Sequence, residues 1–145
     1  MSGPQWGPDR RVMSITVEEL AGQYHEAWTK LDVDDIVALH TEDSVFHLHG
    51  VIEAATGHVA IRQTIGALLR LVPDLHFEAK RAYLGADHIV LEYDMSGTVG
   101  ETHFVCDGAD VIAVENGLVA RKDTYLDLAA YQAQVGPLPT LAIGV

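Results

Sequence analysis

Hydrophobic residues recur every three to four positions in two long segments of the chain, which is the spacing of a helix with one buried face. The first segment, 17–31, follows Thr16 and Glu19, whose spacing matches a capping box that begins a helix. The second segment, 58–72, stops before Pro73, which cannot continue a helix. The pattern therefore predicts two amphipathic helices.

Two shorter helices are predicted as well. One begins at Asp32 or Asp34, both suitable N-caps, and its inner face carries Ile36, Val37 and His40. The other closes the domain over residues 127–134, with Asp127 as its cap and Gly136 after its end.

Alternating apolar and polar residues in the rest of the chain indicate strands with one buried face. We predict strands over residues 45–49, 75–84, 88–95, 103–115 and 118–126. Asn116-Gly117 is a two-residue hairpin signal between the last two strands. The order of elements predicts an α+β fold, in which a strongly bent, mostly antiparallel sheet holds three helices on its concave face and encloses a cavity.

Alternation within each strand separates residues that face the core from those that face solvent. The predicted inward sets are Phe46 and Leu48; Leu91, Tyr93 and Met95; Phe104, Cys106, Gly108, Asp110 and Ile112; and Ala120, Lys122, Thr124 and Leu126.

Asp110 is an unusual member of these inward faces, because a buried carboxylate is costly unless it is paired or protonated. We interpret it as a desolvated acid that favours its neutral form. Asp110→Asn is then expected to preserve stability at neutral pH. The alternative is a structural acid that is hydrogen-bonded to Tyr24 or to the backbone.

Length and composition limit the function. The 145 residues predict one domain over 15–136, with a flexible tail at 1–14 and a second tail at 137–145. A net charge of −12 argues against binding to nucleic acids or to anionic membranes. The single cysteine, Cys106, excludes an internal disulfide and fits a reducing, cytoplasmic location. No apolar run approaches the length of a membrane span.

Three segments carry a resemblance to the nuclear-transport-factor-2-like superfamily. They are Tyr24 followed by DVDDIVALHTEDSVF, the helix start GHVAIR, and NGLVARKDTYLD near the end. Within the superfamily the chain resembles the SnoaL-like group, which includes polyketide cyclases, and its relatives the ketosteroid isomerases and limonene-epoxide hydrolases. The resemblance implies a cone-shaped fold around a ligand cavity.

The resemblance also implies roles for individual residues. Tyr24 and Asp110 match the isomerase residues that donate hydrogen bonds to a developing oxyanion. The position of the isomerase base is held by Leu48, and that of the usual cyclase acid by Thr124. Epoxide hydrolysis is not expected, because the hydrolase positions are held by Leu91, Tyr93 and Thr124.

We therefore expect a small enzyme without a cofactor, which transfers a proton on an apolar, carbonyl-bearing substrate. Asp110 and Tyr24 are the expected catalytic residues. Lys122 would meet an anionic group of the substrate or reach solvent from the sheet edge. The expected substrate-binding residues are Trp28, His40, Phe46, Leu48, Leu69, Tyr93, Phe104, Lys122 and Thr124. The alternative is a non-catalytic module for ligand binding or dimerisation, which the absent base at Leu48 favours.

The outer face of the sheet carries two further expectations. His47 and His49 share this face, and zinc binding with His103 or Glu53 as a third ligand is one interpretation. We prefer a solvated face and expect no metal. A homodimer is expected through this face because some of its residues are too apolar for solvent, among them Val111, Ala113 and Tyr125.

Overall fold

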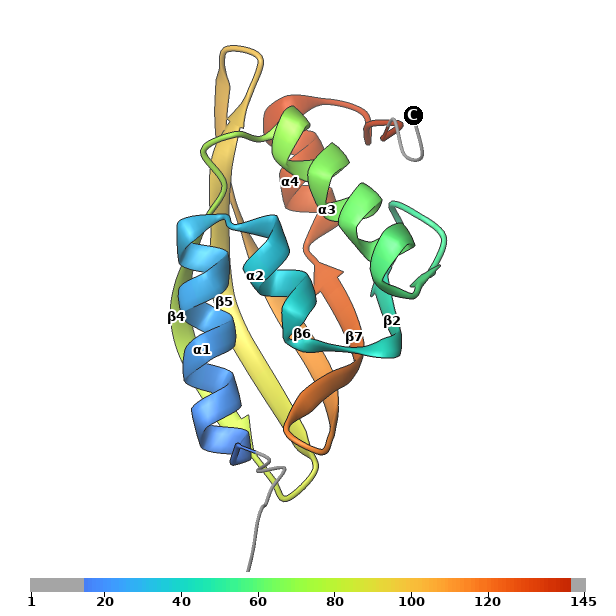
Figure 1. The fold of residues 1–145 in the computed structure, drawn as a ribbon. Coiled ribbons are helices and arrows are strands. Elements are labelled where there is room, and N and C mark those ends of the chain that lie inside the picture. The colour runs from blue at the N-terminus through green and yellow to red at the C-terminus, as the bar shows by residue number, and fades with distance from the viewer. Residues whose placement is uncertain (1–14, 142–145) are drawn as a thin grey trace, which may run out of the picture.

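The computed structural model describes residues 15–141 as a curved six-stranded sheet with helices on one face (Figure 1). The elements are α1 (Val17–Lys30), α2 (Val33–Ala38), β2 (His40–Leu48), β3 (Ala55–Thr56), α3 (His58–Leu71), β4 (His76–Leu84), β5 (His88–Val99), β6 (Thr102–Glu115), β7 (Leu118–Leu126) and α4 (Leu128–Val135). The strand order is β3-β2-β7-β6-β5-β4, and β2 and β7 form the parallel pair of this otherwise antiparallel sheet. The predicted α+β fold is confirmed. The predicted tail at 1–14 lies outside the described residues.

Helices α1, α2 and α4 begin at capping residues that the sequence indicated. The Thr16 hydroxyl accepts a hydrogen bond from the Glu19 backbone N–H at 3.0 Å, and the Glu19 carboxylate accepts one from the Thr16 N–H at 2.9 Å. Asp32, rather than Asp34, caps α2, and Asp127 caps α4. Figure 1 shows α1, α2 and α3 on one face of the sheet, with α4 beside α3.

The first long strand begins earlier than predicted. His40, which was expected on the second helix, is the first residue of β2, so that prediction is wrong. The Val119 N–H donates to the Leu39 carbonyl at 2.8 Å, which brings the chain alongside β7 at this point. The pairing register then shifts between His40 and Val45, and the side chains of both His40 and Ser44 are buried. Because of this irregularity the first residues of β2 do not alternate strictly, so the start of the strand could not be recognised from the sequence.

Burial confirms most of the predicted inward faces. The residues concerned are Phe46, Leu48, Tyr93, Met95, Phe104, Cys106, Asp110, Ile112, Lys122 and Thr124. Near the start of β7 the buried residue is Val119 rather than the predicted Ala120. The reason is a register shift on β7, where the pairing passes from Val114–Val119 to Ala113–Arg121. Ala120 therefore has no pairing partner on β6. Beyond this bulge the even-numbered residues of β7 point into the core, whereas before it the odd-numbered Val119 does.

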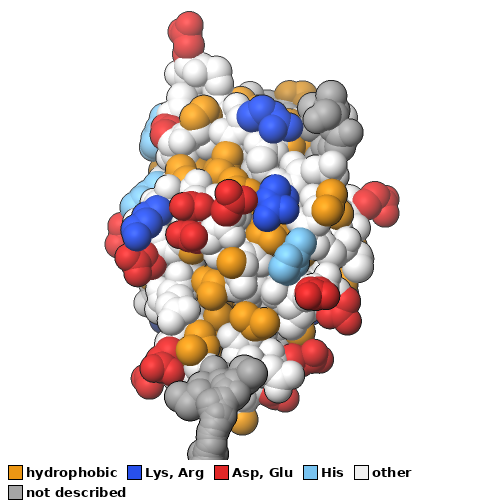
Figure 2. All heavy atoms as spheres, in the orientation of Figure 1, with side chains coloured by type: hydrophobic (Ala, Val, Ile, Leu, Met, Phe, Trp, Pro, Cys, Tyr) orange, Lys and Arg blue, Asp and Glu red, His pale blue; other side chains and the backbone are white. Residues whose placement is uncertain are grey.

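The surface is strongly acidic in keeping with the net charge of −12. Figure 2 shows acidic side chains scattered over the helix-covered face, with fewer basic side chains among them. On the opposite face of the sheet Val105, Val111 and Tyr125 are each nearly half exposed. Among residues 15–141, no helix is long and apolar enough to cross a membrane.

The hairpin between β6 and β7 yields a prediction about stability. Asn116 and Gly117 have φ values of +51° and +76°, as a tight hairpin turn requires. A Cβ at residue 117 would lie 2.9 Å from the backbone N and O of Ile15. We expect Gly117→Ala to lower the free energy of unfolding by about 1–2 kcal/mol, because strain and crowding act together.

Urea denaturation checks this prediction, with Gly22→Ala as the matched control. A Cβ at residue 22, in the middle of α1, meets no atom within 4 Å. The control should therefore gain about 0.5–1 kcal/mol from the better helix propensity of alanine. Equal effects of the two substitutions would contradict the account of the turn.

We propose that the exposed apolar residues on the outer sheet face form a homodimer interface. Val111→Lys should then shift the protein toward monomer in sedimentation velocity at micromolar concentration, since it would bury an unpaired charge. Val59→Lys is the control, because Val59 is 69% exposed on α3, away from this face. A wild-type protein that sediments only as a monomer at this concentration would refute the proposal.

Candidate functional site

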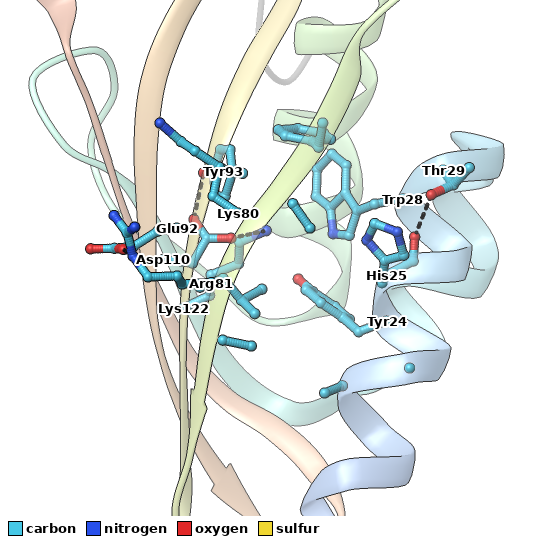
Figure 3. Close-up of a pocket in the computed structure, with 16 residues that line it drawn as sticks. Tyr24, His25, Trp28, Thr29, Lys80, Arg81, Glu92, Tyr93, Asp110 and Lys122 are labelled. Atoms are coloured by element: carbon cyan, nitrogen blue, oxygen red, sulfur yellow. Dashed lines mark hydrogen bonds and ion pairs between the residues drawn. The ribbon is translucent and has the colours of Figure 1, made fainter.

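A cavity of about 330 Å³ lies between α1 and the sheet (Figure 3). Its walls come from α1, β4 and β5, and Asp110 of β6 and Lys122 of β7 reach it from further along the sheet. Small residues face one another across part of this space and leave it unfilled. They are Ala21 and Gly22 on α1, and Ala79 and Ala82 on β4.

An irregularity in β4 helps to form the cavity. The pairing with β5 shifts between Ala79 and Arg81, so Ala79 and Ala82 both line the cavity although three positions separate them. Such bulges are common beside binding sites because they redirect side chains. The charged residues Lys80, Arg81 and Glu92 stand at the exposed rim, where Arg81 pairs with Glu92.

The most buried charges of the site are an ion pair at the end of the cavity. The Lys122 Nζ lies 3.6 Å from Asp110 Oδ2, and the two side chains are only 6% and 7% exposed. The other carboxylate oxygen, Oδ1, accepts hydrogen bonds from the Tyr93 and Thr124 hydroxyls, each at 2.8 Å. Asp110 thus has two hydroxyl donors at one oxygen and an ammonium group near the other, so it has polar partners rather than an apolar surrounding.

Lys122 is surrounded by aromatic rings as well as by its acid. Its Nζ lies 4.2 Å from the ring centre of Trp28, 4.9 Å from that of Tyr24 and 5.3 Å from that of Phe46. Burial by itself would lower the pKa of Lys122, but the attraction of Asp110, followed by that of Tyr24, outweighs it and the pKa is raised. Lys122 is therefore an ammonium group at neutral pH, stabilised by cation–π contacts.

A series of buried hydrogen bonds fixes the Tyr24 hydroxyl. The hydroxyl lies 2.9 Å from His40 Nε2, and His40 Nδ1 lies 2.9 Å from the Ser44 hydroxyl. Burial raises the pKa of Tyr24, which stays a neutral phenol. Burial, helped by Lys122 and His58, lowers the pKa of His40 to about 3, so the imidazole is neutral and can donate at one nitrogen while it accepts at the other.

Trp28 contributes a hydrogen-bond donor that has no acceptor among the described residues. Its side chain is buried, and its indole N–H has no hydrogen-bond partner within residues 15–141. Figure 3 shows Trp28, Tyr24 and Lys122 pointing toward one another. An unsatisfied buried donor costs about 1–3 kcal/mol, and a ligand oxygen placed there would remove that cost.

The structure brings together about half of the residues predicted for the site. The cavity is lined by Tyr24, Trp28, Tyr93, Asp110 and Lys122. Phe46, Thr124 and His40 stand just behind them, in contact with Lys122, Asp110 and Tyr24 respectively.

The remaining predicted residues lie elsewhere. Leu48 and Phe104 border a smaller space of about 40 Å³ near α3 and α4, and Leu69 packs against the core without lining the cavity. Strand parity identifies the inner face but cannot say which part of that face is covered by a helix. Sequence reasoning also missed Phe77, Ala79 and Ala82, because the β4 irregularity interrupts their alternation.

Solved structures share this fold across most of their length. A protein from Catenulispora acidiphila DSM 44928 with a ketosteroid isomerase-like fold, solved with trimethylamine, has a TM-score of 0.76 and 21% identity, over 86% of this chain and 97% of that one. TerC, co-crystallised with polyporic acid, has a TM-score of 0.73 and 13% identity, over 83% and 98%. A protein from Jannaschia sp. CCS1 assigned as a SnoaL-like polyketide cyclase has a TM-score of 0.72 and 18% identity, over 92% and 100%.

At these identities the likeness establishes the fold alone. No curated protein matches the chain by sequence. The model of the SnoaL-like domain family, however, matches residues 21–122, which include most of α1 and the site residues from Tyr24 to Lys122. The resemblance seen in the sequence is thus confirmed, and the chain belongs to the SnoaL-like domain family.

Proposed function

We propose that the cavity binds an apolar small molecule through a carbonyl-type oxygen, and that the protein transfers a proton on it without a cofactor, in the manner of a cyclase or isomerase. One observation carries the proposal. Three donors converge at one end of the cavity, the Lys122 ammonium, the Tyr24 hydroxyl and the unpartnered Trp28 N–H, beside the Asp110 carboxylate.

These groups suit the formation of an enolate. Removal of a proton next to a carbonyl places negative charge on the carbonyl oxygen, and fixed donors in a water-poor site stabilise that charge. Lys122 would supply this stabilisation, with Trp28 as a second donor. Tyr24 would be a third donor in the tautomer of His40 whose Nε2–H donates to the Tyr24 oxygen, since this leaves the tyrosine O–H free for the ligand. Asp110, which only accepts in the structure, would take up the proton rather than donate to the oxyanion.

The shape and lining of the cavity support an apolar ligand. Apart from the donor end its walls are mainly hydrophobic, including Phe77, Ala82 and Leu91. The volume of about 330 Å³ lies at the small end of the range for ligand pockets. Small molecules have been captured in proteins of the same fold, as trimethylamine and polyporic acid show.

A non-catalytic binding module is the second candidate, and a specific observation favours it. Both oxygens of Asp110 already have partners, the Tyr93 and Thr124 hydroxyls at Oδ1 and the Lys122 ammonium near Oδ2, so neither oxygen is free for a substrate proton. Leu48, at the position of the isomerase base, lies outside the cavity. Both candidates require ligand binding, but only the enzyme requires proton exchange.

We also propose a cytoplasmic location. The support is Cys106, a buried free thiol on β6. Burial, together with nearby carboxylates such as Asp127, raises the pKa of this thiol to about 11, so it is a packing residue rather than a reactive group.

Proton exchange on a simple ketone tests the enzyme directly. We expect the wild-type protein to accelerate exchange of the α-protons of 2-tetralone in D₂O, followed by NMR. Asp110→Asn should slow the catalysed exchange by about 100-fold or more, because it removes the proton acceptor. Asp107→Asn is the matched control, since Asp107 is an exposed acid on the outer face of the same strand.

Binding is followed separately through the fluorescence of Trp28 in a Trp6→Phe background, which leaves the cavity tryptophan as the sole indole. Circular dichroism confirms that each variant is folded. Binding without exchange by the wild-type protein would identify the non-catalytic module. Exchange that persists in Asp110→Asn would contradict the role of Asp110.

The neutral His40 behind Tyr24 gives a prediction on pH. Its pKa is about 3 in the folded protein and 6.5 when unperturbed, so the unfolded state gains a proton first as pH falls. The stability that His40 contributes is complete above pH 6.5 and is lost as pH falls through the folded pKa, by up to about 1.4 kcal/mol per pH unit.

His40→Gln, which does not titrate, isolates this contribution from those of the carboxylates. We expect the difference in free energy of unfolding between the wild-type protein and the variant to shrink as pH is lowered from 7.5 to 4.5. Urea denaturation at each pH measures the difference. Parallel curves for the two proteins would show that His40 is not held neutral by the fold.

A further inference from the structure

Two histidines and an aspartate lie together on the outer face of the sheet. The nitrogen and oxygen atoms that His47, His49 and Asp123 could offer to a metal all lie within 4.8 Å of one another. Among the described residues this is the group that meets such a criterion, and it does not include His103 or Glu53. The third ligands considered from the sequence, His103 and Glu53, are thus replaced in this group by Asp123.

The fold explains why these residues meet. His47 pairs directly with Asp123 in the parallel ladder of β2 and β7. Alternation on β2 turns His47 and His49 outward, while Phe46 and Leu48 are buried. The leftover Ala120 on β7 exchanges the faces of that strand, so Asp123 points outward instead of into the core. Without that bulge the three residues would not share a face.

Each side chain is already held near a ligating position. His49 Nε2 lies 2.8 Å from Asp123 Oδ1, and the His49 ring stacks between His47, at 3.7 Å, and Tyr125, at 4.2 Å. Arg121 donates to both oxygens of Asp123, at 2.8 and 3.1 Å. Such outer partners orient metal-binding carboxylates in proteins.

The exposure and the chemistry of the group also suit a metal. The His49 and Asp123 side chains are 31% and 15% exposed, so an ion can reach them from solvent. Two imidazoles with one carboxylate are a ligand set for borderline divalent ions such as Zn²⁺ and Co²⁺ rather than for Mg²⁺ or Ca²⁺.

We propose that His47, His49 and Asp123 form a binding site for a divalent transition metal, which links β2 to β7. The site lies on the opposite face of the sheet from the cavity and does not depend on the proposed reaction. Because the metal would bind the folded ladder and not the separated strands, it would stabilise the native state.

Calorimetric titration of the untagged, full-length protein with ZnCl₂ tests the proposal. We expect one ion per chain, a higher melting temperature with Zn²⁺, and no comparable effect of Mg²⁺. Bound Co²⁺ should show the visible absorption bands of cobalt that is coordinated by protein imidazoles. His47→Ala and Asp123→Asn should each weaken Zn²⁺ binding by about tenfold or more, since each removes a ligand.

His88→Ala is the matched control. His88 is also exposed and lies 3.1 Å from a carboxylate, that of Asp87, but it belongs to no group of three. This variant should bind Zn²⁺ as tightly as the wild-type protein. Melting temperatures in EDTA establish that all variants fold, and His47→Ala is decisive because it leaves the Arg121–Asp123 pair intact. Absence of binding, or binding by His47→Ala within about twofold of wild type, would overturn the proposal.

Discussion

The buried ion pair between Lys122 and Asp110 is the interaction on which the rest of the site depends. Transfer of two charges out of water costs several kcal/mol per ion, and their mutual attraction offsets this only with good geometry and further partners. Tyr93 and Thr124 supply hydroxyl donors to the acid, and three aromatic rings surround the ammonium. The pair thereby fixes the positions of most groups at the donor end of the cavity.

This arrangement changes the chemistry that the family resemblance implies. In the resemblance, a neutral Asp110 and Tyr24 would each donate one hydrogen bond to an oxyanion. In the structure Asp110 instead accepts hydrogen bonds from its neighbours, and the charged donor at the cavity is Lys122. Tyr24 keeps its predicted place at the cavity but is held through His40 and Ser44 rather than by Asp110. The proposed proton transfer therefore assigns the donor and acceptor roles to different residues than the resemblance does.

The sequence predicted the elements and most of their inner faces, since helical spacing, capping residues and strand alternation are local properties. It could not predict the irregularities. A two-residue turn at Asn116-Gly117 with regular pairing would place Asp110 opposite Asp123. The leftover Ala120 places Thr124 there instead, and sends Lys122 inward and Asp123 outward. A one-residue bulge depends on packing against the whole sheet, so no short stretch of sequence signals it.

The same limit explains the site residues that were missed or misplaced. The β4 irregularity brings Ala79 and Ala82 to one wall, and the β2 irregularity brings Ser44 to His40. Asp110 was identified because an acid among apolar residues is visible in the sequence. Its partner Lys122 was expected to meet the substrate or to reach solvent, and its pairing with Asp110 was not predicted, since that depends on the register between β6 and β7. Bulges thus determine both the cavity and the composition of the outer histidine–aspartate group.

A double-mutant cycle on Asp110→Asn and Lys122→Met tests the central claim most directly. If the ion pair holds the donor end together, each single substitution leaves an unpaired buried charge and lowers the free energy of unfolding at neutral pH by about 3 kcal/mol or more. The double variant should lose much less than the sum, with a coupling free energy of at least about 1.5 kcal/mol. Additive losses, or an Asp110→Asn variant as stable as the wild-type protein, would contradict the account and restore the neutral acid.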